Sequence, residues 1–190
     1  MQNLIGSLLK KLTKKIVPQN LRFSAGPARC HIKVQKSLVE LIKNALKISE
    51  AQLESLNNRL QEGSMTVMYI TDKEDPDTVL CCAVGLVYNS QNGEKILFLA
   101  SFVTHEDYRK QGLGNHLLRN LKFICGENGI NYVMFSSNEY SHNLFTKNFN
   151  LQTVEAGSEG QKILSTFDLG ILVDSQGNDS INQKLYLAKV

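Results

Sequence analysis

Long apolar runs are missing from this sequence. The chain has 190 residues, 42% of them hydrophobic, yet no uninterrupted apolar stretch approaches the roughly 18 residues that a membrane-spanning helix needs. The first apolar run is broken by Lys10 and Lys11, so it does not read as a secretory signal. The length suits one globular domain with an additional segment, and a chain of this size can bury a core without disulfides or metals.

Cysteines are few and have no metal-binding spacing. Cys30, Cys81, Cys82 and Cys125 form no Cys-x-x-Cys pair and no cluster with histidines. On a strand, the adjacent Cys81 and Cys82 would point to opposite faces. We therefore expect free thiols in a reducing compartment, a cytoplasmic protein and no metal site, rather than a disulfide or zinc framework.

Acidic residues are absent from the first 39 positions. This head contains eight basic residues, whereas residues 40–190 contain 13 basic and 18 acidic ones. The head therefore carries a charge of +8 and the body −5. Such a division of charge predicts two functions or two contact surfaces in one molecule.

Residues 1–20 are predicted to form a separate basic segment. Apolar residues follow helical spacing over residues 3–17, lysines occupy the other face, and Pro18 would end the helix. Three interpretations stay open: packing on its own domain or on a second copy in a homodimer, peripheral contact with a membrane surface, and a removable targeting peptide. Nucleic acid is not expected as a partner, because the basic residues share their helix with a wide apolar face and no aromatic residues are interleaved.

The rest of the chain, residues 29–190, is predicted to be one mixed α/β domain after loop-like residues 18–28. A capping box at Ser49 and Gln52 opens one helix, and Gly63 closes it. Asn92-Gly93 predicts a hairpin. We expect strands at 30–35, 64–72, 78–89, 94–104 and 130–136, helices at 37–47, 49–63, 113–127 and 139–148, polar loops at 155–161 and 174–183, and a closing antiparallel pair after Leu151 that ends at 184–190.

A Gly-x-Gly sequence stands where the helix at 113–127 begins. The first turn of a helix leaves backbone N–H groups unpaired and carries partial positive charge, and glycines let a ligand approach that backbone closely. Arg109 and Lys110 add full charges beside Gly112 and Gly114. The combination predicts an anion site suited to a pyrophosphate. It is neither the dinucleotide fingerprint, since position 117 is not glycine, nor a phosphate loop ending in Gly-Lys-Ser/Thr.

Residues 103–118, VTHEDYRKQGLGNHLL, resemble the Gcn5-related N-acetyltransferase (GNAT) superfamily, whose pyrophosphate loop reads Arg/Gln-x-x-Gly-x-Gly/Ala. Residues 136–149, SSNEYSHNLFTKNF, are similar to a second stretch of that family through Asn138, Ser141, Phe145 and Phe149. The element order matches over about 30–190, and the motifs over about 97–149. The resemblance implies a GNAT-like fold, a mixed and mostly antiparallel central sheet flanked by helices, here with an extra N-terminal amphipathic helix.

The resemblance also implies acetyl-CoA as co-substrate, lying in a V between the strand ending near Val103 and the strand ending near Ser136. The backbone of Phe102 and Val103 would pair with the pantetheine arm, and Asn138 and Phe145 belong to its far end. An amine acceptor, a small molecule or a protein, would attack the thioester directly. The pyrophosphate would be held by Arg109, Lys110, Gln111, Gly112, Leu113, Gly114 and Asn115.

The sequence departs from the family at the catalytic positions. The strand before the loop offers only Ser101 where the family often has a carboxylate or histidine, so His105 and Glu106, just past its end, are the candidate bases. The family's proton-donating tyrosine is replaced by Phe145, and Tyr140 stands five residues earlier. These departures leave open a non-catalytic acyl-CoA-binding or interaction module on the same fold. The acidic body favours a cationic acceptor.

Overall fold

The computed structural model describes residues 20–27, 31–137, 139–155, 157–167 and 184–190. The predicted amphipathic helix at 3–17, the polar loop at 174–183 and Asn138 lie outside these residues.

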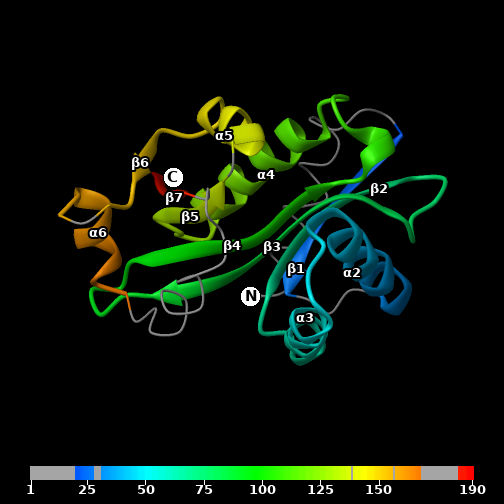
Figure 1. Cartoon of the computed structure of the whole chain (residues 1–190), viewed down its shortest axis with the longest axis horizontal. Helices are drawn as coiled ribbons and strands as arrows, with labels where there is room; N and C mark the ends of the chain where they lie inside the picture. The colour runs from blue at the N-terminus through cyan, green and yellow to red at the C-terminus, as the bar shows by residue number, and fades with distance from the viewer. Residues whose placement is uncertain (1–19, 28–30, 138, 156, 168–183) are drawn as a thin grey trace. The chain divides into compact units, whose positions relative to one another are not determined.

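The described chain forms a mixed α/β fold (Figure 1). Its strands are β1 Leu21–Pro27, β2 Thr66–Asp72, β3 Val79–Asn89, β4 Lys95–Thr104, β5 Tyr132–Ser137, β6 Leu151–Thr153 and β7 Lys184–Lys189. Its helices are α2 Ile32–Leu46, α3 Glu50–Glu62, α4 Leu113–Glu127, α5 Glu139–Thr146 and α6 Glu159–Leu164, with a short 3-10 turn, η1, at Glu106–Tyr108.

The strand order is β1-β2-β3-β4-β5-β7-β6. The pairs β1–β2, β2–β3, β5–β7 and β6–β7 are antiparallel, and β4–β5 is parallel. A parallel pair needs a crossover, which α4 provides between β4 and β5. The predicted mixed, mostly antiparallel sheet is therefore confirmed. The chain divides into two compact units, and β3 and β4 each run through both.

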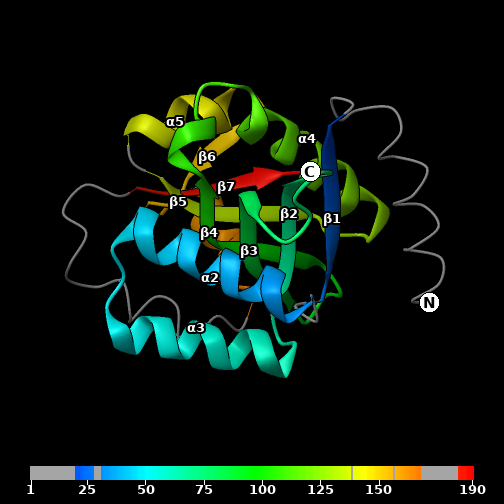
Figure 2. The same cartoon turned by 90° about the vertical axis from the view of Figure 1, so that its right-hand side faces the viewer.

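The first unit includes residues 20–85 and 101–117 among those described. Its strands β1 and β2 pair from Leu21↔Asp72 to Pro27↔Thr66. Helices α2 and α3 lie side by side (Figure 2). One face of α2 is buried through Val34, Leu38, Leu41 and Ile42, the helical spacing that an amphipathic helix uses to cover a core.

The second unit includes residues 86–100 and the described residues after 117. The parallel ladder runs from Ile96↔Tyr132 to Leu99↔Phe135, and β5 continues beside β7 as far as Ser137↔Lys184. A buried cluster fills its core: Ile96, Phe98, Met134, Phe167 and Leu187.

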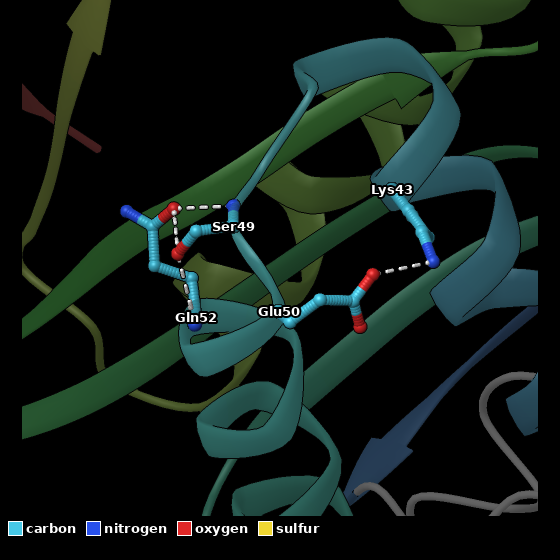
Figure 3. A network of polar contacts seen from close by, with 4 residues as sticks. All are labelled: Lys43, Ser49, Glu50 and Gln52. Atoms are coloured by element: carbon cyan, nitrogen blue, oxygen red, sulfur yellow. Dashed lines mark hydrogen bonds and ion pairs between the residues drawn. The ribbon is translucent and has the colours of Figure 1, made fainter.

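The junction between α2 and α3 is fixed by local contacts (Figure 3). Lys47 ends α2 in the left-handed conformation, at φ 51°. The Ser49 hydroxyl accepts the Gln52 N–H at 3.3 Å, and the Gln52 side chain accepts the Ser49 N–H at 2.9 Å. An ion pair of 2.9 Å joins Lys43 to Glu50 across the junction. The predicted capping box and the Gly63 end of α3 are thus confirmed.

The predicted first strand at 30–35 is wrong, because α2 already begins at Ile32. The apolar stripe of α2 extends back to Val34, and this longer helical pattern outweighs the short alternation. The first strand instead occupies Leu21–Pro27, within the residues expected to be a loop. Its extended conformation depends on pairing with β2, about forty-five residues away, and its proline stands at the end of an edge strand, where no ladder bond is lost.

A helix was also missed within the predicted loop at 155–161. Helix α6 begins there because the Ser158 hydroxyl accepts the Gln161 N–H at 3.2 Å. The Gln161 side chain accepts the Gly157 N–H in return. This is the same Ser-x-x-Gln signal that opens α3 at Ser49.

Replacing Ser49 by alanine should destabilise the protein by about 1 kcal/mol, because the amide of Gln52 loses its acceptor at a helix start. Urea unfolding followed by circular dichroism measures this change. Ser55→Ala, an exposed position inside α3, is the matched control and should change stability little. Equal effects of the two substitutions would contradict the capping role.

Candidate active site at the start of α4

Backbone hydrogen bonds order the turn between β4 and α4. The His105 N–H donates to the Leu80 carbonyl of β3 at 2.8 Å. The Tyr108 and Arg109 amides close the η1 turn on His105 and Glu106. The turn is therefore bonded to β3 at its first residue and closed internally at η1.

Gly112 has the geometry of a helix start. Its φ is +87°, and Lys110 also has a positive φ, +62°. The His116 N–H donates to the Gly112 carbonyl at 3.0 Å, so the amides of Gly112, Leu113 and Gly114 come before this bond. A Cβ at Gly112 would meet nothing within 4 Å. The turn therefore requires glycine for its backbone conformation, in which L side chains are strained, and the space beside it is open.

Positive charge gathers at this helix start. Arg109 and Lys110 are exposed, and Leu113, buried, anchors the first turn of α4. The Arg109 Nε donates to the Thr104 carbonyl at 3.3 Å, and the Gln111 side chain donates to the Asp107 carbonyl at 2.9 Å. Two cationic side chains thus stand beside the positive end of a helix dipole, an arrangement that stabilises an anion.

His105 and Glu106, the candidate bases, lie side by side in this turn with different orientations. The His105 Nδ1 accepts the Asp107 N–H at 3.4 Å and lies 3.7 Å from the Asp107 carboxylate. The Nδ1 atom of His105 therefore faces Asp107. The Glu106 side chain is exposed, and its carboxylate can accept a proton. Both residues line the cavity described next.

A cavity of about 740 Å³ adjoins the turn within the first unit. One wall is α2, and the other is formed by Asp77 to Val79 and Thr104 to Glu106 with Arg109. The Ser37 hydroxyl accepts the Val79 N–H at 2.9 Å and ties the two walls together. The residues that line it are Lys33, Lys36, Ser37, Glu40, Leu41, Asn44, Ala45, Asp77, Thr78, Val79, Thr104, His105, Glu106 and Arg109.

The sequence did not point to the α2 side of this cavity. Lys36, Glu40 and Asn44 read as the polar face of an amphipathic helix, and their only local signal is helical spacing. They join His105 and Arg109 because the Ser37–Val79 bond connects positions 42 residues apart.

Phe102 and Val103 stand at the end of β4, half-buried and buried respectively. The strand beside them carries two buried thiols. The Cys81 thiol lies 3.2 Å from the Thr104 hydroxyl, and burial raises its pKa to about 12. Burial also raises the pKa of Cys82 well above its usual value and that of Cys125 to about 12. These thiols stay protonated at neutral pH and carry no nucleophile for the site.

The remaining predicted residues belong to the second unit. Phe145 is only 2% exposed and stacks on Phe135 with the ring centroids 3.9 Å apart. Tyr140 lies in the first turn of α5, and Asn138 falls outside the described residues.

Two features are absent from the described residues. No helix in these ranges combines the length and the apolar composition required to cross a membrane. In the same part of the chain, no three His, Cys, Asp or Glu side chains come together as a metal ion would need.

Sequence comparison assigns the chain to a family. The sequence profile of the acetyltransferase (GNAT) family matches residues 38–150, more than half of the chain. The chain therefore belongs to the acetyltransferase (GNAT) family. No curated protein matches the sequence.

Solved structures share the fold at low sequence identity. An acetyltransferase from Streptococcus agalactiae matches with a TM-score of 0.62 and 13% identity, over 91% of this chain and 100% of that one. A Trypanosoma brucei acetyltransferase matches with a TM-score of 0.56 and 17% identity, over 72% and 96%. A chain of the NatC complex, bound to Gag peptide and CoA, matches with a TM-score of 0.62 and 10% identity, over 90% and 99%.

The buried thiols should resist labelling in the native protein. In a Cys30→Ser variant at pH 8, Ellman's reagent should react with Cys81, Cys82 and Cys125 far more slowly than in the same chain unfolded in guanidinium, because the native thiols are both buried and protonated. Absorbance of the released thionitrobenzoate measures both rates. Rapid labelling of a native thiol would contradict the burial described.

Proposed function

We propose that the protein is an acetyl-CoA-dependent N-acetyltransferase whose co-substrate pyrophosphate binds at the start of α4. The observation that carries this proposal is the left-handed Gly112 before α4, with open space beside it and Arg109 and Lys110 adjacent. A pyrophosphate fits such a place, since helix amides, dipole and side-chain charge all favour an anion there. Membership of the GNAT family supports the reaction type.

Each residue of the turn takes a role. The amides from Gln111 to Asn115 bind phosphate oxygens, and Arg109, whose Nε is engaged by the Thr104 carbonyl, directs the rest of its guanidinium at them. Lys110 adds a second charge. The family resemblance adds the backbone of Phe102 and Val103 for the pantetheine arm, and Asn138 and Phe145 for its far end.

Acetyl-CoA, when bound, supplies an activated acyl group for direct attack by an amine. An acceptor that arrives as an ammonium ion must first lose a proton. Glu106 serves as the base in this proposal, because its carboxylate is exposed beside the turn, whereas the His105 Nδ1 faces Asp107. His105 and Tyr140 remain the other candidate residues for proton transfer.

A non-catalytic acyl-CoA-binding module is the second candidate function. Phe145 favours it, since a buried phenyl ring stacked on Phe135 cannot protonate a leaving thiolate as the family's tyrosine does. Consumption of acetyl-CoA in the presence of a panel of amines separates the two functions: turnover supports the enzyme, and tight binding without turnover across the panel supports the module.

The loop proposal is tested by calorimetric titration of acetyl-CoA. Gly112→Asp should weaken binding about tenfold or more, because a carboxylate within about 4 Å of a phosphate repels it by roughly 1–4 kcal/mol. Gly112→Asn, which also tolerates left-handed backbone, should weaken binding less.

Gly93→Asp is the matched control. Gly93 has φ +82° and open space around it, as Gly112 does, but lies in the β3–β4 hairpin. It should show a similar change in unfolding midpoint with unchanged acetyl-CoA affinity. Equal affinity of Gly112→Asp and wild type would rule out this turn as the pyrophosphate site.

The basic head, residues 1–39, supports a proposal about where in the cell the protein acts. We expect a cytoplasmic enzyme that docks on anionic membranes through residues 1–17, where lysines share a segment with a wide apolar set. Co-sedimentation with vesicles of anionic lipid should fall strongly on deletion of residues 1–20, and in 0.5 M salt as charges are screened. Unchanged co-sedimentation of the deletion variant would remove the docking role.

A further inference from the structure

The cavity between α2 and the β4–α4 turn has an ordered arrangement of charge. Its α2 wall is a single stripe, in which Lys33, Lys36, Glu40 and Asn44 follow one another at helical spacing. The opposite wall adds Asp77, Glu106 and Arg109. Both signs of charge therefore face one cavity.

The cationic end lies at the N-terminus of α2. Lys33 pairs with Asp77 at 3.3 Å, and Lys36 has no ion-pair partner among the residues described. The first turn of α2 contains no acidic residue, and its N-cap residue, His31, makes no side-chain capping bond. The helix dipole adds to the lysine charges at this end, which therefore favours an anionic group.

The anionic part lies one helical turn further on. Glu40 follows Lys36 by four residues, about 6 Å along the helix axis, and Glu106 faces the same cavity from η1. Lys36 and Glu40 stand at the spacing of an intrahelical ion pair, yet in the described part of the chain neither of them, nor Glu106, belongs to an ion pair. These carboxylates are placed to receive a cation.

The cavity lining also contains less polar residues, which we call the floor. Leu41 and Val79 are buried, and half-buried Ser37, Ala45 and Thr104 complete it. A short methylene chain can lie on such a floor while its charged ends reach the rim.

We propose that this cavity receives the acceptor and that the acceptor is a zwitterionic amine. Its anionic group lies at Lys36 and its ammonium group lies at Glu40, with Glu106 on the opposite wall as the base. The assignment as acceptor rests on the proposed acetyl transfer, and Thr104, which lines the cavity, directly follows Phe102 and Val103, the residues assigned to the pantetheine arm. The charges of the acceptor are separated by about one helical turn, roughly 6 Å.

The transfer balances as follows. The ammonium group gives one proton to a carboxylate of the cavity, for which Glu106 is placed. The amine nitrogen then forms a bond to the acetyl carbonyl carbon as the carbon–sulfur bond breaks. The sulfur leaves with the bonding pair and takes up the second proton, which the nitrogen loses as it becomes an amide, so that an amide, a thiol and the one proton first given to the carboxylate result.

The binding test uses three probes of one chain length: 5-aminopentanoate, pentylamine and pentanoate. Calorimetry without acetyl-CoA should show 5-aminopentanoate binding at least tenfold more tightly than either singly charged probe. Comparable affinities for all three probes, or no binding of 5-aminopentanoate at millimolar concentration, would overturn the zwitterion site. Because acetyl-CoA is absent, this result does not depend on the co-substrate loop.

Substitutions place the probe in the cavity. Glu40→Gln and Lys36→Gln should each weaken 5-aminopentanoate binding about tenfold and leave the weak binding of the probe lacking the matching charge nearly unchanged. Lys43→Gln and Glu54→Gln, exposed positions of α2 and α3 outside this cavity, are the controls and should bind as wild type does. Wild-type affinity in both cavity variants would overturn the proposal.

Measurement of turnover tests whether the zwitterionic amine is the acceptor. With acetyl-CoA, 5-aminopentanoate should be acetylated with a KM at least tenfold below that of pentylamine, and Glu40→Gln should raise this KM. Binding of 5-aminopentanoate together with acetylation of pentylamine alone would overturn the acceptor role. Failure of acetyl-CoA to bind would instead count against the proposed function, while the probe titrations would still report on the cavity.

Discussion

The amides at the start of α4 are the constraint around which the site is organised. Helix geometry leaves the first backbone donors of any helix without a carbonyl partner, and a chain must supply another acceptor. At α3 and α6 the acceptors are the hydroxyls of Ser49 and Ser158. At α4 the residue before the helix is Gly112, which has no side chain to offer. The same local requirement is met by a serine hydroxyl at two helices, whereas at the third we propose that a phosphate of the co-substrate meets it.

The backbone conformation of this turn costs free energy. Lys110 and Gly112 both have positive φ, which costs a lysine roughly 1–2 kcal/mol and a glycine almost nothing. Hydrogen bonds of Arg109 to Thr104 and of Gln111 to Asp107 offset part of this cost and orient both side chains. Strain, charge and backbone polarity are thus concentrated in a few consecutive residues, of which Arg109 also borders the mixed-charge cavity.

Local signals explain what could be predicted from the sequence. Ser49, Gln52 and Gly63 define α3 through contacts within a few residues, and the glycine turn before α4 is equally local, so both were predicted. Strand β1 was missed because its conformation depends on β2, and its own sequence resembles a loop. The α2 wall of the cavity was missed for a related reason. Glu40 and Arg109 border the same cavity only once β3, β4 and α2 are assembled. The Ser-x-x-Gln pattern at Ser158 was present in the sequence, but it was not used to predict α6.

The vicinal cysteines show how the middle of the sheet is aligned. All residues of β3 from Val79 to Gly85 are buried. This stretch therefore has no solvent-exposed face and no alternation of apolar with polar side chains. A strand of that kind could slide by one residue along its neighbours without exposing anything apolar. Polar contacts help to align it: the Ser37 hydroxyl on the Val79 amide, the His105 amide on the Leu80 carbonyl and the Ser90–Glu94 turn after the strand. In the folded protein these polar contacts define which residues of the buried stretch lie opposite one another.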